Sequence, residues 1–209
     1  GKPLFGAIGD SAPDRWGRAL MRRSERKTAE REGRTPGTLM EIDYLLLVDD
    51  GIRQGALRFR DANTSEFLAN MQPVIPPLVD LPKLLAASDR VSNDTDSEDD
   101  LRLLLAPGSS LGGARPKAAV VDSNGSLAIA KFPHKGDEYN IELWSCLALV
   151  LARNAGIKVP SHRMTNVADR QVLLVTRFDR NGGRRIPFLS AMSMIGAADN
   201  ETHSYLELV

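Results

Sequence analysis

The stretch Lys117–Phe132, KAAVVDSNGSLAIAKF, decides the fold. Two short apolar runs flank Asn124-Gly125, and an Asn-Gly pair between apolar runs is the strongest short-range signal for a β-hairpin. In the second run, the alternation of a strand places Lys131 and Phe132 on opposite faces. Neither face is polar, so we expect a buried strand. Its lysine must then either reach the sheet edge along its stem or point at a ligand phosphate.

Outward from this hairpin, helical and strand-like patterns alternate along the chain. The short 168–170 connection between two later apolar runs also favours antiparallel pairing. We therefore predict an α+β fold with a twisted, mainly antiparallel sheet and one packed helix. Helices are expected at about 14–34, 38–48, 82–87, 99–105 and 139–154, and strands at 55–60, 117–122, 127–132, 162–167 and 171–177.

The composition excludes several classes of protein. The 209 residues are 42% hydrophobic, which excludes whole-chain disorder, and their formal net charge of zero excludes a globally basic nucleic-acid binder. No apolar run approaches the ~18–20 residues of a membrane span, and the first residues lack a secretion signal. The single cysteine, Cys146, excludes an internal disulfide and a zinc site built on several cysteines, so we expect a cytoplasmic protein.

Opposite charges gather in two separate segments. Residues 1–40 hold nine basic against five acidic residues, most of them on the expected helix at 14–34. That helix is either a solvated face with pairs four residues apart or a patch for nucleic acid or a protein partner. Residues 93–100, NDTDSEDD, contain five acids and no apolar residue. They are expected to form an exposed loop that caps a short helix.

Two further segments could carry chemistry. Residues 107–117, PGSSLGGARPK, run directly into a strand and are either a phosphate-binding loop or a flexible connector. Their spacing matches neither the Walker pattern nor Gly-x-Gly-x-x-Gly. Residues 172–180, VLLVTRFDR, are an apolar strand that ends in charges. Such an end either presents backbone groups to a flat ring or is a salt-bridged strand exit. The histidines at 134, 162 and 203 have no carboxylate at motif distance and suggest no catalytic role.

Six blocks, in order across nearly the whole chain, resemble the HipA-like serine/threonine kinase family, the toxin in HipBA-type toxin–antitoxin modules. This family transfers a phosphoryl group from Mg-ATP to a protein hydroxyl, with translation factors among its targets. The resemblance implies ATP and Mg²⁺ as cofactors and an antitoxin-like helix-turn-helix partner through which DNA would be reached only indirectly. The blocks are FGAIGDSAPDRWGR (5–18), DYLLLVDD and GALRFR (43–60), PGSSLGGARPKA (107–118), AIAKFP (128–133), LARNAGIKVP (151–160) and LLVTRFDR (173–180).

The resemblance also implies roles for individual residues. Residues 109–117 would be a mobile loop over the ATP phosphates, and Ser110 would be the serine whose autophosphorylation ejects that loop. Lys131 would hold the phosphates, and Thr176 and Phe178 would offer backbone groups to adenine. The complete ATP-binding set implied is Leu111, Gly112, Gly113, Ala114, Arg115, Lys117, Lys131, Thr176 and Phe178.

The chain departs from the family pattern in two places. Where a glutamate should pair with the phosphate lysine, the sequence has Ser145, and Glu142, three residues earlier on the same helical face, could take its place. The catalytic-loop Asp, its nearby Asn and the Mg²⁺-binding Asp are expected well after residue 180, yet the 29 residues that follow contain no such loop.

We therefore expect a fragment truncated at both ends. Residues 1–80 would be a partial accessory subdomain and residues 81–209 the ATP-binding lobe of a kinase-like domain without its catalytic lobe. On this interpretation the chain has no catalytic residue, no metal ligand and no phosphotransfer activity by itself. The alternative is a non-catalytic module that docks a DNA-binding antitoxin through its basic helix.

Overall fold

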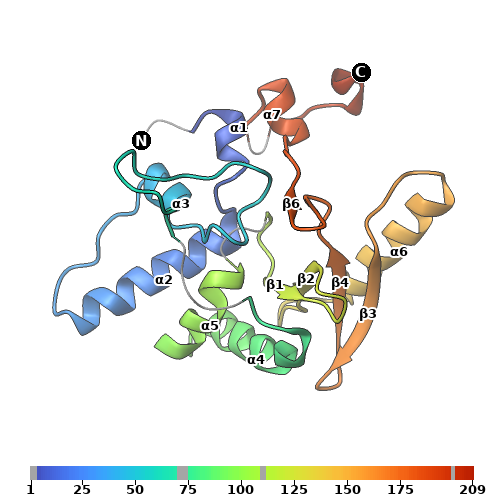
Figure 1. The fold of residues 1–209 in the computed structure, drawn as a ribbon. Helices are drawn as coiled ribbons and strands as arrows, with labels where there is room; N and C mark the ends of the chain where they lie inside the picture. Colours follow the sequence, from blue (N-terminus) through green and yellow to red (C-terminus); the bar gives the residue numbers. More distant parts are fainter. Residues whose placement is uncertain (1–3, 70–74, 109–111, 199–200) are drawn as a thin grey trace.

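The computed structural model describes residues 4–69, 75–108, 112–198 and 201–209. Helices dominate the first half of the chain and an antiparallel sheet the second (Figure 1). The helices are α1 (Gly6–Gly9), α2 (Arg15–Arg31), α3 (Glu41–Leu46), α4 (Leu81–Ser92), α5 (Glu98–Gly108), α6 (Ile141–Asn154) and α7 (Ala191–Ile195), with 3₁₀ turns η1 (Leu78–Asp80) and η2 (Tyr205–Leu208).

The main sheet has four strands in the order β1-β2-β4-β3, and every neighbouring pair is antiparallel. Its strands are β1 (Lys117–Val121), β2 (Leu127–Lys131), β3 (His162–Val167) and β4 (Arg170–Thr176), while β5 (Arg180–Asn181) and β6 (Arg184–Arg185) form a separate ribbon. The hairpin around Asn124-Gly125 is confirmed. Gly125 has a φ of +78° and donates its N–H to the carbonyl of Asp122 at 2.8 Å, a turn that favours glycine. The α+β prediction is confirmed.

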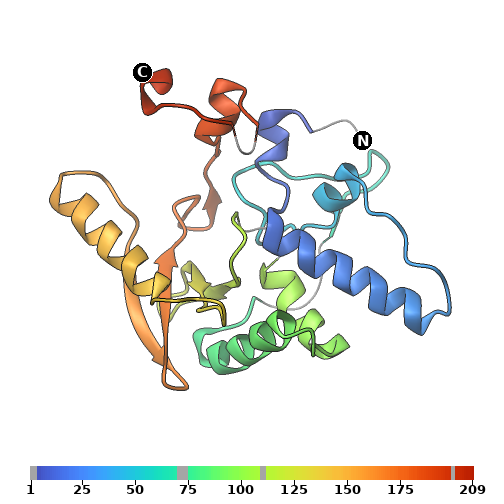
Figure 2. The same ribbon diagram turned by 180° about the vertical axis from the view of Figure 1, so that it is seen from behind.

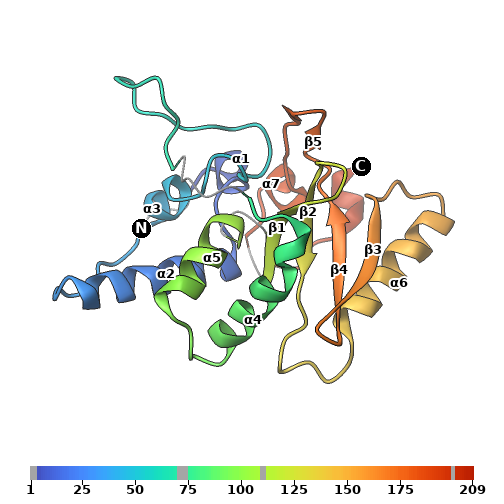
Figure 3. The same cartoon turned by 60° about the horizontal axis from the view of Figure 1, so that its bottom comes forward.

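Helices cover both faces of the sheet. Figure 3 shows α4 and α5 on one side and α6 against β3 and β4 on the other. The alternation predicted for β2 is confirmed: Ala128 and Ala130 are buried against α4 and α5, and Ile129 and Lys131 face away from that core. The face that carries Lys131 is therefore turned toward α6.

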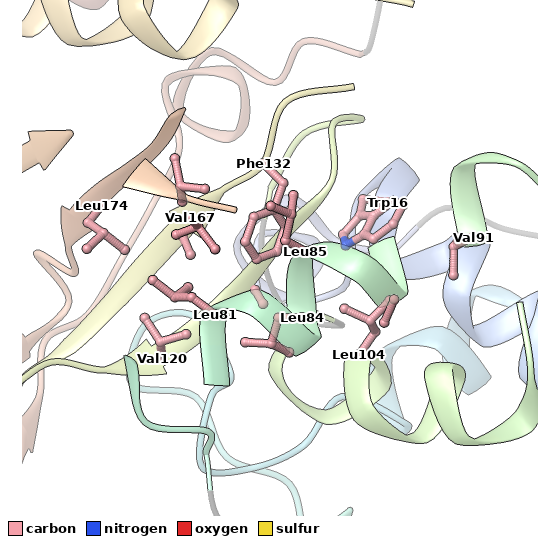
Figure 4. Packing of buried hydrophobic residues seen from close by; sticks show 14 of the residues in the cluster. Trp16, Leu81, Leu84, Leu85, Val91, Leu104, Val120, Phe132, Val167 and Leu174 are labelled. Atoms are coloured by element: carbon pink, nitrogen blue, oxygen red, sulfur yellow. The ribbon is translucent and has the colours of Figure 1, made fainter. Parts of the chain in front are cut away.

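One apolar core joins the two halves of the sequence. It packs Trp16 and Leu20 of α2 with Leu84 of α4, Leu104 of α5 and Phe132 beside the sheet (Figure 4). Fully burying a side chain of this kind stabilises the fold by ~1.5–3 kcal/mol. Because the core crosses residue 80, α2 packs directly on elements of the second half, mainly α5. The division at residue 80 stays a prediction.

The N-terminal helices follow the sequence pattern closely, with one shortened. Asp14 caps α2, its carboxylate accepting the N–H of Arg15 at 2.7 Å. The helix predicted over 38–48 is shorter in the structure, where α3 begins only at Glu41. Met40 is its N-cap residue, and the N–H of Met40 donates to the carboxylate of Asp43 at 2.8 Å. Although they are far apart in the sequence, α1 lies beside α7 (Figure 2).

The strand predicted at residues 55–60 is wrong. The segment makes a single bridge, between Arg60 and Phe67, and Leu57 is 44% exposed. Its one aromatic side chain, Phe59, is covered by an arginine instead of by a neighbouring strand. The guanidinium of Arg53 lies 4.7 Å from the ring centre of Phe59. An alternating pattern forms a strand only where a partner strand is available.

The basic helix and the acidic loop pair with one another. Arg23 of α2 contacts Asp94 and Asp96, and Arg31 contacts Glu98. These are tertiary ion pairs with residues 94–98 and not pairs along one helix face. The patch that could have received an external acidic partner is thus largely neutralised within the chain. In the part of the chain that the structure describes, no helix is both long and apolar enough to cross a bilayer.

Candidate functional site

A cavity of about 500 Å³ opens between the sheet and α6. Its floor includes Ile129 and Val175 of the sheet, and Ser145 and Ala148 of α6 form its wall. The end of β4, from Thr176 to Asp179, completes it on one side. A volume of this size fits a small-molecule or cofactor ligand, and apolar walls with a few polar groups are typical of such sites.

Two lysines enter this cavity from neighbouring strands. Lys117 and Lys131 are direct cross-strand partners in β1 and β2, so both side chains lie on one face of the sheet. Like charges directly opposite each other are destabilising unless an anion compensates them. Lys117 is only 5% exposed. Its pKa is lowered to about 8, mainly by burial and to a smaller extent by the charge of Lys131, against the opposing effect of Asp14.

The glycine-rich segment folds over the ammonium group of Lys117. Its Nζ donates to the carbonyl of Gly112 at 2.7 Å. Gly113 has a φ of +97°, a backbone conformation that favours glycine, and a Cβ there would crowd the same Nζ at 3.1 Å. The N–H of Gly113 donates to the carboxylate of Asp14, which ties the segment to the start of α2. The cavity end nearest the lysines is therefore lined by backbone and positive charge.

Arg115 lies outside the cavity wall and pairs with two acids. Its guanidinium contacts the carboxylate of Asp137 and lies 3.5 Å from that of Glu142. Glu142 is 2% exposed and lines a second, polar cavity of about 670 Å³. Its pKa is raised by burial and, to a smaller extent, by Asp137. The glutamate that could have replaced the one missing at Ser145 is thus paired with Arg115 in a neighbouring cavity, whereas Ser145 itself shares the first cavity with Lys131.

The exit of β4 forms an edge of the cavity and also contains a buried ion-pair cluster. It therefore has features of both predicted alternatives, a strand end that presents backbone groups to a flat ring and a salt-bridged strand exit. Thr176 and Phe178 line the cavity. The N–H of Thr176 donates to the carbonyl of Ser161 at 2.8 Å, which leaves the carbonyl of Thr176 as its candidate backbone group for a base. Asp179, 2% exposed, accepts hydrogen bonds from the guanidinium groups of Arg177 and Arg180.

The structure therefore brings together part of the predicted site. The cavity is lined by five of the implied ATP-binding residues, namely Gly112, Lys117, Lys131, Thr176 and Phe178. Gly113 and Arg115 shape the segment beside the cavity. Among the described residues, Gly113, Ala114 and Arg115 do not line the cavity itself. Ser110 and Leu111 lie outside the described residues.

Sequence reasoning missed Gln54 and Asp179 as cavity residues. Asp179 belongs to the charged strand end at 172–180, and those charges were the available signal. Gln54 had no such signal, because it reaches the cavity only through a contact between segments more than a hundred residues apart.

The arrangement agrees with a comparison against protein families. Residues 109–209 match the model for the HipA-like C-terminal domain. Residues 109–209 belong to the HipA-like family. This HipA-like region contains both lysines, α6 and the β4 exit. A search of curated proteins finds no match to the chain.

The residues present fit ATP better than they fit a metal ion by itself. Two adjacent ammonium groups beside glycine backbone suit a polyphosphate, and their mutual repulsion gives an anion a direct electrostatic role. Among the described ranges, no group of three or more His, Cys, Asp or Glu side chains is arranged to hold a metal.

Proposed function

We propose that this chain binds ATP in the lysine cavity as the nucleotide-binding part of a HipA-like serine/threonine kinase. One observation carries the proposal: Lys117 and Lys131 face each other across β1 and β2 and line one cavity, with Lys117 buried. A buried lysine beside a second lysine is costly in the free protein. Binding of a polyphosphate removes that cost and is therefore strongly favoured.

Different residues along the cavity contact different parts of the nucleotide. The ammonium groups of Lys117 and Lys131 hold the phosphates, with Gly112 and Gly113 allowing the backbone to approach closely. Thr176 and Phe178, at the exit of β4, receive the base. Mg²⁺ would enter with ATP and would supply neutralisation of phosphate charge beside the two lysines.

Other parts of the proposal come from the family and go beyond this cavity. They include phosphoryl transfer to a protein hydroxyl of the translation machinery, with Ser110 as the site of autophosphorylation. A helix-turn-helix antitoxin is the proposed partner. The ion pairs between α2 and residues 94–98 argue against the basic helix as its main contact, because Arg23 and Arg31 already have acidic partners.

Calorimetric titration of ATP into the purified chain tests the proposal. We expect wild-type binding to weaken at least tenfold in Lys131→Ala, since a charge-assisted contact to phosphate contributes ~1.5–3 kcal/mol. The matched control is Lys135→Ala, whose exposed ammonium group contacts Asn93 away from the cavity. The proposal is wrong if the wild-type chain does not bind ATP, or if Lys131→Ala binds it as tightly as Lys135→Ala does.

A further inference from the structure

Gln54 brings a polar side chain into the lysine cavity from the other half of the sequence. Among the described residues that line this cavity, it is the only one that precedes Gly112. It follows α3 and the buried loop that begins at Asp49, far from β4 along the chain. Its position beside the β4 exit is therefore produced by tertiary contacts alone.

These contacts hold the backbone on both sides of Gln54. On one side, Arg53 is fully buried and donates to the carbonyls of Leu45 and Val48, each at 2.9 Å. On the other side, the N–H of Gly55 donates to the carboxylate of Asp179 at 2.8 Å.

The β4 exit fixes the same loop from the opposite direction. Arg180 donates to the carbonyl of Arg53 at 2.8 Å, and Arg177 donates to that of Ile52 at 2.6 Å. Gly55 itself has a φ of +75° and lies against Phe188, so only glycine fits this position well. The loop and the exit of β4 form one rigid unit with Gln54 at the cavity edge.

The carboxamide of Gln54 takes no part in this hydrogen-bond network. Its side chain is half-buried, and within the described ranges it makes no hydrogen bond to another protein group. Neighbouring polar side chains are engaged inside the protein: Asp179 accepts from three partners, and the two terminal nitrogens of Arg53 donate to backbone carbonyls, although its Nε has no partner among the described residues. A rigidly placed amide without a protein partner, at a cavity edge, is suited to contact a ligand.

We propose that Gln54 hydrogen-bonds the base of the bound nucleotide and selects adenine through its N6 and N7 atoms. The inference rests on the proposed function, because it assigns the base to the Thr176–Asp179 end of the cavity. An amide donates one hydrogen bond and accepts another side by side, which matches the acceptor N7 and the donor N6 of adenine. Guanine presents two acceptors, N7 and O6, at the same edge, so one amide contact becomes unfavourable.

Calorimetry with ATP, 7-deaza-ATP and GTP tests this contact. 7-Deaza-ATP keeps N6 and the phosphates but lacks the N7 acceptor. We expect the wild-type chain to bind it about three- to tenfold more weakly than ATP, the range for one net hydrogen bond. GTP should bind more weakly still.

Gln54→Leu should bind ATP and 7-deaza-ATP equally, and its preference for ATP over GTP should shrink. Gln54→Glu keeps the shape but offers only acceptors, so it should lose the N7 effect as well. Gln171→Leu is the matched control, because Gln171 lines the second cavity. Thermal melts should show both Gln54 variants as stable as wild type, since Gln54 makes no protein hydrogen bond among the described residues that the substitutions remove, whereas Gln171→Leu removes the bond that Gln171 accepts from Asn140.

The outcomes separate the two levels of the proposal. If the wild-type chain binds ATP but Gln54→Leu keeps the wild-type ratio of ATP to 7-deaza-ATP affinity, Gln54 does not contact the base and the inference is overturned, while the ATP site stands. If the wild-type chain binds none of the three nucleotides, the proposed function fails and the inference fails with it. Loss of the N7 effect in both Gln54 variants, but not in Gln171→Leu, supports it.

Discussion

Removing the carboxylate of Asp179 should strongly destabilise the fold. The side chain is 2% exposed and accepts the Nε and Nη2 groups of Arg177 at 2.8 and 2.6 Å, Nη1 of Arg180 at 2.8 Å and the N–H of Gly55 at 2.8 Å. It joins the β4 exit to the loop at 52–55 through Gly55, and it orients the two arginines that donate to the carbonyls of Ile52 and Arg53. Asp179→Ala leaves two guanidinium groups, 2% and 12% exposed, without their shared counter-charge.

The magnitude follows from the burial of all three groups. Deleting one partner of a buried ion pair costs about 3–5 kcal/mol, because the remaining charge stays desolvated. Domains of this size unfold with only ~5–15 kcal/mol, so Asp179→Ala should lose a large fraction of the free energy of unfolding. Asp179→Asn keeps the shape and one acceptor oxygen, and its loss should be smaller.

Urea denaturation followed by circular dichroism measures the effect. Asp99→Ala is the control, because its carboxylate is 92% exposed and such substitutions change stability by less than about 0.5 kcal/mol. A loss below about 1 kcal/mol in Asp179→Ala, with an unchanged slope against urea, would refute the argument that this carboxylate joins the two segments.

The same residue predicts a dependence on pH. Burial raises the pKa of Asp179, but the hydrogen bonds and charges of Arg177, with Gly55 and Arg180, lower it by more, so the net shift is downward. A carboxylate with a lowered pKa stabilises the fold above its unfolded pKa near 4, and this contribution is lost as the pH falls through the folded pKa. The gap between wild type and Asp179→Asn should therefore narrow below about pH 4.

Two further substitutions test the cavity and the core. Lys117→Met should raise the free energy of unfolding at pH 7 by about 2 kcal/mol while weakening ATP binding, because burial lowers the pKa of Lys117 to about 8 and its charge is costly in the folded state. Between pH 8 and 10.5 the unfolded chain binds more protons at Lys117 than the folded chain does, so the free energy of unfolding of the wild type should rise with pH. This rise should be smaller in Lys117→Met. A variant less stable than wild type at pH 7 would contradict the prediction. Gly108→Ala should cost about 1–3 kcal/mol in urea denaturation, since its Cβ would lie 2.9 Å from Leu20 Cδ1 and 3.2 Å from Trp16 Nε1. Gly112→Ala, whose added Cβ would meet nothing within 4 Å, should match wild type, and equal losses in both would refute the crowding.

Local patterns in the sequence were sufficient wherever local interactions form the structure. The helix α2 begins where Asp14 can cap it, and the β3–β4 pair follows from two strand-like runs with a short connection, which the pattern predicts at 168–170 and which has two residues, 168–169, in the structure. The segment 55–60 had an equally good alternating pattern, but no neighbouring strand was available to pair with it. Its Phe59 packs instead against the guanidinium of Arg53, which donates hydrogen bonds to carbonyls of α3 and of the following loop. Whether a partner strand lies beside a segment depends on tertiary structure, which the local pattern does not contain. The position of Gln54 in the cavity depends on tertiary structure in the same way.

The lysine pair shows how a single residue of register decides the site. A two-residue Asn-Gly loop would pair Ser123 with Ser126 and set Lys117 opposite Phe132, with Lys131 on the other face of the sheet. In the structure, Asp122 donates its N–H to the carbonyl of Ser126, and the connection has three residues ending in Gly125 with positive φ. This shift by one position sets Lys117 opposite Lys131 and turns both lysines toward α6. The sequence allowed either loop. The longer one is favoured because it buries Ala118, Val120, Ala128 and Ala130 together against α4 and α5, which places both charges in the cavity on the other face.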